Sequence, residues 1–497
     1  MFKSRYNIEV EGNQRELLLF NASSGAFAVL RGGARLIYES YEKGDFCKAK
    51  SVNSKYGVIE DDMDFLFGID PGDNMDFGLD FGDEFDFPTN KLVPGKAYVD
   101  KLIEDGFITL LTPDEELWVE QERFRAIRHD SRELTICLAP SYKCNHACPY
   151  CDVRKHGARN SLMSEKVIDS VLEFILSRHE SKPFEKLTVQ WYGSGPSLCL
   201  DLVEHFSSIL TSFCVAREIV YNSTMLDSCD SFVDASSVDT LVECGVTNAI
   251  VTMDVAGKQS DDAAPTHFSQ AVQIFKKMLD RGIGVQVVCD VDSAGWPVYL
   301  ELRRKLGKIG IPLRPAKHND CYGTFGAEAC GAPSNDFFMR DEFASACHKA
   351  MFDGKSGLNA IHELLHPCGK FCHGQVDSYM VVDAIGDVYK CDGAVGHAEH
   401  RKFNILDGVD LDAMRQITFD ATTDEKCSQC KLMPVCQGSC YWERERTGTP
   451  CEQLFKTVAS YLRYYRNMFG RMGYNEYVCL ATSIPEEEVP SLKWPTK

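Results

Sequence analysis

The sequence lacks long hydrophobic runs and lacks an excess of basic charge. No window approaches the ~18 apolar residues that a membrane-spanning helix needs, and the start of the chain has no unbroken apolar stretch typical of a signal peptide. Lys and Arg number 53 against 73 Asp and Glu, a formal net charge of −20. Nonspecific binding to nucleic acid or to anionic membranes needs a basic surface, so we expect neither partner. These absences predict a cytoplasmic protein.

Cysteine, by contrast, is abundant, with 22 in the 497 residues. A large cytoplasmic chain does not use so many for disulfides, because cellular thiols keep them reduced. Isolated cysteines are expected to be small buried apolar side chains, whereas tight groups of cysteines indicate bound metal. The isolated ones are Cys47, Cys137, Cys199, Cys214, Cys229, Cys244, Cys289 and Cys479.

Residues 131–320 alternate between strand and helix patterns. Helical spacing of apolar residues occurs at 165–178 and 268–280, and Gly245 and Gly282 stand where helices end. This series predicts an α/β fold with a parallel sheet, open or barrel-like, whose functional residues follow the carboxyl ends of the strands. The predicted strands are 134–139, 187–192, 218–221, 249–254, 285–290 and 311–314.

Different patterns flank this series and suggest further domains. Residues 1–130 contain short strand patterns at 17–20 and 27–30, followed by a segment at 60–87 with eleven acidic residues and no Lys or Arg. That segment is either a solvated, poorly ordered insertion or a docking strip for a basic partner. We predict domains at 1–130, 131–335 and 336–480, the last rich in cysteine and typical of a metal-stabilised unit, with a polar tail at 481–497.

The first cysteine group directly follows the first strand of the series. Cys144, Cys148 and Cys151 have CxxxCxxC spacing. Three thiolates can bind three of the four irons of a [4Fe–4S] cluster, which leaves one iron open for an external ligand. A zinc site that recruits His146 is the alternative, but it would not account for the βα series.

This motif at this place resembles the radical S-adenosylmethionine (SAM) superfamily. The resemblance implies a partial (β/α)6 TIM-like barrel in which SAM binds the open iron, with Tyr150 near the adenine. The segment after the second strand keeps the glycine and proline of the family's GGEP-like motif but lacks its glutamate. By resemblance, the SAM contacts fall on Gly193, Ser194, Gly195, Asn222, Thr252 and Asp254.

A second cysteine set has the spacing Cys372-x13-Gly386-x4-Cys391, followed by Cys427-x2-Cys430-x5-Cys436-x3-Cys440 and then Cys451. This set resembles the SPASM extension of radical SAM enzymes that modify peptides. The resemblance implies two auxiliary [4Fe–4S] clusters, hence three in all. The fourth ligand of the first auxiliary cluster is Cys368, with Cys347 as its rival, or else that iron is open. The alternative to clusters is a single zinc site at Cys427, Cys430, Cys436 and Cys440. The implied ligands are Cys372, Cys391 and Cys440 with Cys368 for the first cluster, and Cys427, Cys430, Cys436 and Cys451 for the second.

Asp392 directly follows Cys391. In sulfatase-maturing relatives, an aspartate at this place serves as the base in substrate oxidation, so the resemblance makes Asp392 a candidate catalytic residue. An ordinary turn aspartate is the alternative.

The same resemblance points to a peptide substrate. Residues 1–130 resemble the opening of maturases for ribosomally synthesised, post-translationally modified peptides, which implies an N-terminal α+β domain that docks the precursor's leader by strand addition. The expected partners are a precursor peptide and a reductase, flavodoxin or ferredoxin as electron donor. The leading hypothesis is a peptide maturase that forms a crosslink, thioether or carbon–carbon. The alternatives are a formylglycine-generating sulfatase maturase and a non-catalytic iron–sulfur scaffold that binds peptide.

Overall fold

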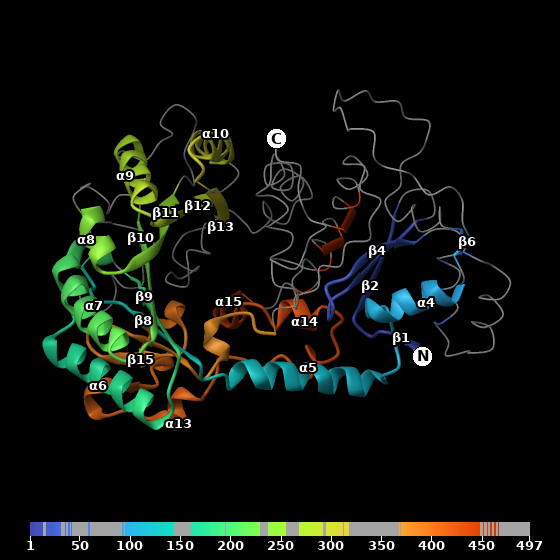
Figure 1. Ribbon diagram of the computed structural model, residues 1–497, viewed down its shortest axis with the longest axis horizontal. Helices are drawn as coiled ribbons and strands as arrows, with labels where there is room; N and C mark the ends of the chain where they lie inside the picture. The colour runs from blue at the N-terminus through green and yellow to red at the C-terminus, as the bar shows by residue number, and fades with distance from the viewer. Residues whose placement is uncertain are drawn as a thin grey trace.

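The computed structural model of the chain is shown in Figure 1. It describes residues 1–12, 16–30, 95–143, 161–193, 195–228, 237–254, 268–291, 295–311, 313–317 and 369–447, with short pieces at 35, 38–39, 41, 58–59, 92–93, 367, 451 and between 455 and 466. The acidic segment 60–87 lies outside the described residues.

A nine-stranded sheet organises the molecule, in the order β13-β12-β11-β10-β9-β8-β14-β15-β16. Its strands β8 to β13 stand side by side in chain order and are parallel, so the predicted parallel sheet is confirmed. They are β8 (Glu133–Leu138), β9 (Lys186–Trp191), β10 (Val220–Ser228), β11 (Val246–Asp254), β12 (Gly284–Val291) and β13 (Leu313–Lys317).

Helices connect these strands and cover one face of the sheet (Figure 1). On β8, Leu134, Ile136 and Leu138 are buried in the core shared with the helices, while Cys137 belongs to a second core on the opposite face. This alternation follows from the two-residue period of a strand. The helices are α6 (Glu165–Ser181), α7 (Leu200–Val215), α8 (Ser237–Glu243), α9 (Phe268–Asp280) and α10 (Trp296–Gly307), with the 3-10 turn η3 (Pro196–Cys199) before α7.

One helical segment is longer and more apolar than we expected from the sequence. Pro196–Val215 spans 20 residues with a mean hydropathy of 1.4, enough by length and composition alone to cross a membrane. In the structure, Val203, Phe206 and Leu210 on this segment are buried in the core between helices and sheet. A core helix of an α/β domain has this same composition.

The C-terminal region extends the same sheet. Strand β14 (Tyr379–Val382) pairs in parallel with β8, and β15 (Asp387–Tyr389) and β16 (Phe403–Asn404) follow in antiparallel pairing. Gly386 lies in the turn between β14 and β15 with φ +88°, a conformation that side chains with a Cβ rarely adopt. The pairing of this hairpin with β8 was not predicted from the sequence.

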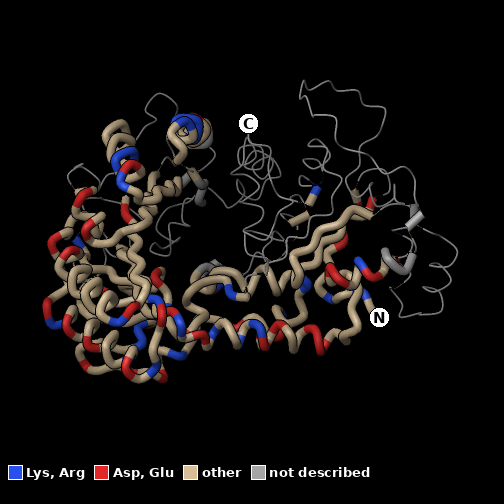
Figure 2. The backbone as a smooth tube through the Cα atoms, viewed as in Figure 1, with Lys and Arg blue, Asp and Glu red and all other residues tan. Residues whose placement is uncertain are grey.

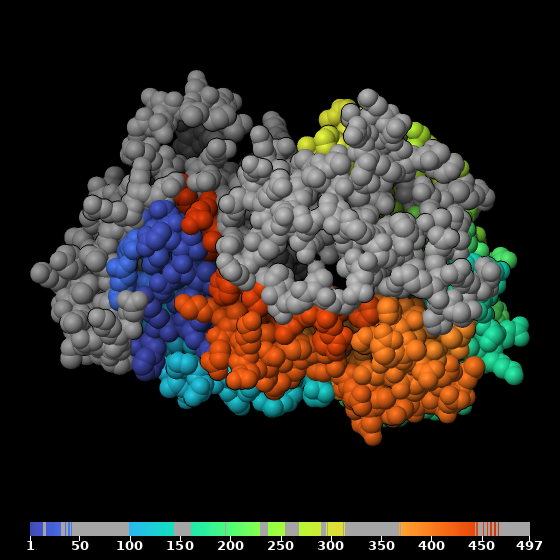
Figure 3. All heavy atoms as spheres, turned by 180° about the vertical axis from the view of Figure 1, so that it is seen from behind, coloured from blue at the N-terminus to red at the C-terminus, as the bar shows by residue number. Residues whose placement is uncertain are grey.

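The N-terminal region forms a three-stranded antiparallel sheet with its own core. That core continues into the C-terminal part of the chain, because Ala421, Leu432, Met433, Val458 and Leu462 are buried with it. Figure 3 shows the C-terminal residues in orange and red between the N-terminal sheet and the βα part. The elements are β2 (Asn7–Glu11), β3 (Leu17–Asn21) and β4 (Phe27–Leu30), the pair β1 (Phe2–Lys3) and β7 (Ile108–Thr109), the pair β5 (Val58–Ile59) and β6 (Leu92–Val93), and α4 (Gly95–Glu104).

Helix α5 (Pro113–Arg128) runs between the N-terminal sheet and the βα part (Figure 1). It begins with a capping box in which Thr112 and Glu115 satisfy each other's backbone N–H groups. Gln121 donates to the carbonyl of Thr422, and Arg128 pairs with Asp377. Its surface carries both acidic and basic residues (Figure 2), and we did not predict this helix from the sequence.

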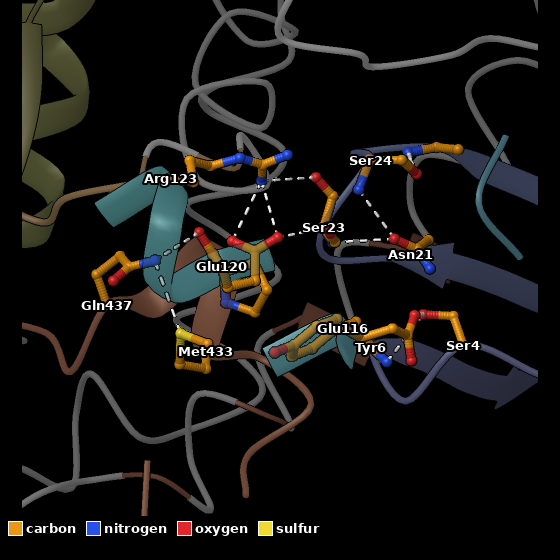
Figure 4. A network of polar contacts seen from close by, with 12 residues as sticks. Ser4, Tyr6, Asn21, Ser23, Ser24, Glu116, Glu120, Arg123, Met433 and Gln437 are labelled. Carbon is orange, nitrogen blue, oxygen red and sulfur yellow. Dashed lines mark hydrogen bonds and ion pairs between the residues drawn. The ribbon is translucent and has the colours of Figure 1, made fainter. Parts of the chain in front are cut away.

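Two buried glutamates attach α5 to the N-terminal sheet (Figure 4). Glu116 accepts hydrogen bonds from the Ser4 hydroxyl at 2.6 Å and the Arg5 N–H at 2.9 Å. Glu120 accepts from the Ser23 hydroxyl at 2.5 Å and pairs with Arg123. Burial raises the pKa of both glutamates, and these donors supply the partners that buried carboxylates require.

The remaining elements are short and surround the C-terminal cysteines. They include the helices α13 (Leu411–Met414), α14 (Met433–Cys436) and α15 (Tyr441–Thr447). The 3-10 turns are η7 (His373–Gln375), η8 (Asp392–Ala394), η9 (Ala398–His400) and η10 (Ile405–Asp407).

Candidate metal centres and nucleotide edge

Several predicted site residues lie outside the described part of the chain. These are Cys144, Tyr150, Ser194, Cys368, the rival ligand Cys347, and the two further cysteines of the first motif, Cys148 and Cys151. Their roles stay predictions. The other site residues fall on described segments.

The first described cysteine group unites three distant segments. Cys372 precedes η7, Cys391 follows β15, and Cys440 precedes α15. Burial raises the pKa of the Cys391 thiol well above its ordinary value, and the neighbouring thiols of Cys372 and Cys440 raise it further. Burial likewise raises the pKa of Cys372 to about 11, with Cys440 again among its neighbours. The fold therefore brings these three thiols within electrostatic range of one another.

Backbone N–H groups donate hydrogen bonds to the sulfurs of this group. Cys372 accepts from Gly374 and Gln375, and Cys391 accepts from Gly393. The buried side chain of Gln375 holds the turn, since its amide donates to the carbonyls of Phe419 at 3.1 Å and Gln437 at 3.0 Å. Such donors stabilise a thiolate and are typical of iron–sulfur ligands.

The second described group contains Cys427, Cys430, Cys436 and Cys451. Burial raises the pKa of the Cys436 thiol to about 12, and the thiols of the other three members add to the rise. Cys436 accepts a hydrogen bond from the Gly438 N–H. Cys427 accepts one from Arg444 Nη1 at 3.4 Å.

The donor chemistry of both groups fits iron–sulfur clusters. Several thiols that face one another are stable as thiolates only beside strong positive charge, and soft thiolate ligands suit iron–sulfur clusters. In the part of the chain that the structure describes, no three His, Cys, Asp or Glu side chains are close enough to hold a single metal ion. The Cys440 thiol raises the pKa of Cys372 and Cys391, and the Cys451 thiol raises the pKa of Cys430 and Cys436. Ligation by these residues stays a prediction.

Asp392 belongs to the surroundings of the first group. It begins η8 directly after Cys391, and burial raises its pKa to about 6. Its carboxyl also raises the pKa of the thiols of Cys372 and Cys137. A carboxyl in this place can hold or release a proton near neutral pH.

The carboxyl ends of the parallel strands carry the predicted nucleotide contacts. Gly193 and Gly195 follow β9 with φ of +106° and +116°. A Cβ on Gly193 would lie 3.2 Å from the Cβ of Ala139, so the chain needs glycine for this close approach. Thr252 and Asp254 lie at the carboxyl end of β11.

The structure places Asn222 elsewhere. Strand β10 covers Val220–Ser228 and not the predicted 218–221, so Asn222 is near its amino end, where it accepts a 2.6 Å hydrogen bond from Thr247 Oγ1. The predicted strand 218–221 and the family resemblance put Asn222 at the carboxyl end, but the strand continues: Ser223 is buried and accepts from Trp191 Nε1 at 3.1 Å. Packing thus overrides local propensity.

Asp227 is the residue that sequence reasoning missed at this edge. It lies at the carboxyl end of β10, is 2% exposed, and accepts a hydrogen bond from the backbone N–H of Ser197 at 2.9 Å. The contact joins β10 to the turn that follows β9. A longer strand assignment would have brought Asp227 to this edge.

The order of β8 to β13 and their helices define an α/β protein with a fold known from solved AdoMet-binding proteins. The structure of anSMEcpe with bound AdoMet matches with a TM-score of 0.51 and 16% identity, over 68% of this chain and 99% of that chain. The complex of anSMEcpe with AdoMet and the Cp18Cys peptide matches with a TM-score of 0.51 and 16% identity, over 69% of this chain and 99% of that chain.

Other comparisons add less. SuiB from Streptococcus suis, bound to its precursor peptide SuiA, has a TM-score of 0.41 at 13% identity over 90% of this chain and 97% of that one, too low to support an argument. No protein-family model and no curated protein matches the chain. The predicted resemblance to radical SAM maturases is confirmed at the level of the fold.

Proposed function

We propose that the chain is a radical SAM enzyme that modifies a peptide, built from a partial (β/α)6 TIM-like barrel, an N-terminal peptide-docking domain and a SPASM domain. The gathering of Cys372, Cys391 and Cys440 from distant segments, on a fold shared with AdoMet-bound anSMEcpe, carries the proposal. The proposed domains are 1–130, 131–335 and 336–480, and the proposed location is the cytoplasm.

The proposed cofactors are three [4Fe–4S] clusters and SAM. Cys144, Cys148 and Cys151 would hold the catalytic cluster. When bound, this cluster and SAM supply a 5′-deoxyadenosyl radical that can abstract hydrogen from a substrate carbon. The two described cysteine groups would hold the auxiliary clusters, with Cys368 as a further ligand of the first.

The chain's own residues would bind SAM and exclude water. The turn at Gly193 and Gly195 allows a ligand to approach the backbone closely, because neither glycine presents a Cβ. Beside it, Tyr142 and Tyr192 belong to a buried apolar core on the face of the sheet away from the helices. Such a lining removes water and stray hydrogen donors from a reactive site.

Asp392 would accept a proton from the substrate. Its position next to Cys391 lets a proton leave the substrate beside the auxiliary group that would take up the electron. This placement also favours the second candidate function, a formylglycine-generating sulfatase maturase, because that reaction oxidises its substrate.

The proposed substrate is a ribosomally made precursor peptide. Complexes of anSMEcpe with a peptide, on the same fold, support a peptide substrate. In the N-terminal sheet, β3 is central and β2 and β4 are the edges, so either edge strand could accept a leader segment by strand addition. We propose a crosslink, thioether or carbon–carbon, as the product, with a reductase, flavodoxin or ferredoxin as electron donor.

Iron, sulfide and SAM cleavage test the proposal together. Anaerobically reconstituted wild type should contain about twelve irons and release 5′-deoxyadenosine under reductant. The triple variant Cys144→Ala/Cys148→Ala/Cys151→Ala should keep about eight irons and release none. About four irons plus zinc in the wild type would remove the auxiliary clusters, and full iron without SAM cleavage would favour a non-catalytic scaffold that binds peptide.

A further inference from the structure

The sequence contains the tripeptide Tyr-Lys-Cys twice, at 142–144 and 389–391. Each copy leads to a cysteine that we assign to a different iron–sulfur cluster, Cys144 to the catalytic one and Cys391 to the first auxiliary one. Their tyrosines, 247 positions apart (389 minus 142), meet at one buried carboxylate.

The carboxylate is that of Asp383, which follows β14 and is 0% exposed. Its Oδ2 accepts hydrogen bonds from the Tyr142 hydroxyl at 2.6 Å and the Tyr389 hydroxyl at 3.3 Å. Its Oδ1 accepts from the backbone N–H groups of Ile385 at 3.0 Å and Asp387 at 2.9 Å. One oxygen therefore holds the hairpin turn, and the other holds the two tyrosines.

Sheet pairing explains why these groups meet. Strand β14 is parallel to β8, with Val382 opposite Leu138, so the segments that leave both strands emerge at the same edge of the sheet. Tyr142 lies on the segment that leaves β8, and Asp383 on the segment that leaves β14. Tyr389 on β15 is brought back to the same place by the antiparallel hairpin.

The buried hydrogen bonds between Asp383 and the two tyrosines are strong enough to hold the tyrosine segments in place. Tyr142 is 5% exposed and Tyr389 is 0% exposed, so their hydroxyls and the carboxylate are all shielded from water. Hydrogen bonds to a buried charged group are stronger than neutral ones, and removal of one partner leaves the others unsatisfied. Burial raises the pKa of Asp383, while the hydrogen bonds from Tyr142, Asp387 and Ile385 lower it.

We propose that Asp383 is a positioning residue that fixes the Tyr142 segment against the Tyr389 segment. It thereby fixes the point where the chain leaves the described residues toward Cys144, relative to the first auxiliary cysteine group. The inference about loop placement rests on the proposed function, whereas the mechanical coupling of the two segments does not.

Hydrogen exchange on the reconstituted full-length protein tests the coupling. The amide of Tyr142, which donates to the carbonyl of Ser161 at 2.9 Å, reports on the first segment. Asp383→Asn keeps an acceptor for the turn amides but cannot accept from both tyrosines. We expect about tenfold faster exchange at Tyr142 and at 388–391, and little change at Ile385 and Asp387.

Single tyrosine variants sharpen the result. Tyr142→Phe should speed exchange in its own segment and, through Asp383, loosen the Tyr389 segment as well. In the double variant Tyr142→Phe/Asp383→Asn, exchange should be little faster than in the single variants, because both substitutions remove the same hydrogen bond. Tyr299→Phe is the matched control, since Tyr299 is a buried tyrosine that donates to the Leu313 carbonyl at 3.1 Å on the other side of the sheet. Faster exchange in only one of the two tyrosine segments would overturn the coupling. So would a double variant in which the effects of the two single substitutions add fully.

A magnetic measurement tests the consequence for the clusters. Electron paramagnetic resonance of the reduced protein reports the dipolar coupling between the catalytic and first auxiliary clusters. We expect one narrow coupling in the wild type and a broadened one in Asp383→Asn at unchanged iron content. An unchanged coupling would refute the positioning role. A wild type without SAM cleavage would instead refute the proposed function, while the exchange result would still decide the coupling.

Discussion

The two cysteine groups share their ligand chemistry but belong to different cores. Cys391 and Cys440 of the first group pack on the core that lines the face of the sheet away from the helices. Cys427, Cys430 and Cys436 of the second group pack against the core of the N-terminal sheet. The same ligand chemistry is therefore connected to two different parts of the structure, the first group to the βα part and the second group to the N-terminal region.

Removal of each group's ligands should give the largest effects and show whether the groups are independent. Cys372→Ala/Cys391→Ala and Cys430→Ala/Cys436→Ala should each lower iron content by about four per chain, because each pair would hold one cluster. Iron and sulfide analysis under anaerobic conditions measures this. Loss of all auxiliary iron from either variant would show that the two groups form one site.

A core substitution tests the link between the second group and the N-terminal region. Phe27 is 0% exposed in the N-terminal core, so Phe27→Ala should destabilise that core by about 3–5 kcal/mol. The second group should then lose iron while the first keeps it. Phe206→Ala, equally buried against the parallel sheet, is the control and should spare the second group. Equal loss of iron from both cysteine groups in Phe27→Ala would contradict the conclusion that they belong to separate cores.

Arg444 offers a difference in electrostatics between the groups. It donates to Cys427 Sγ and to the Gly438 carbonyl at 3.0 Å, and it lies over the Phe419 ring. A cationic donor favours the more negative reduced cluster, so Arg444→Met should lower the second group's reduction potential by on the order of 50 mV. Potentiometric titration followed by electron paramagnetic resonance measures this. A change in reduction potential confined to the first group would contradict the placement of Arg444 at the second group.

Helix α5 connects the two cores, and its first turn can be weakened alone. Thr112→Ala removes the capping box and should cost about 1 kcal/mol. Hydrogen exchange should become faster in the first turn, near Glu115, while the last turn near Arg128 stays protected. Faster exchange along the whole helix would show that the capping box, and not tertiary contacts, holds α5.

The smallest expected effect concerns pH and the buried Glu120. Burial raises its pKa above the ordinary value of 4.5, so ionisation opposes folding. The contribution of the protonated Glu120 carboxyl to the free energy of unfolding is fully present below pH 4.5. It is lost as the pH rises through the folded-state pKa. The melting temperature of Glu120→Gln relative to wild type should therefore increase between about pH 4 and pH 8. A decrease over this range would contradict the direction of the shift.

The sequence predicted elements whose apolar residues follow a regular period. Residues 268–280 match α9, and the expected end glycines Gly245 and Gly282 have positive φ. Helix α5 was missed because its buried face is polar, with Glu116 and Glu120 beside a single phenylalanine, Phe124. Its capping box was the one local signal available.

The candidate site was predicted only as far as local spacing reaches. The resemblance to the SPASM extension predicted the members of both described groups, but pairing of β14 with β8 depends on segments more than 200 residues apart in the chain. The position of Asp383 follows from this long-range pairing, so no local pattern marks it, whereas Asp227 was missed because the predicted strand ended at 221 and β10 extends to Ser228. Asn222 was misplaced because the predicted strand ended at 221, whereas β10 extends to Ser228.

The place of β14 also has a consequence for solubility. By pairing with β8, it covers the exposed row of backbone N–H and C=O groups that β8 would otherwise present beside the parallel series. Uncovered sheet edges of this kind recruit strands from other molecules. The cysteine-rich region is therefore also an edge cover, and a shortened chain that ends before Tyr379 should aggregate even with its parallel strands intact.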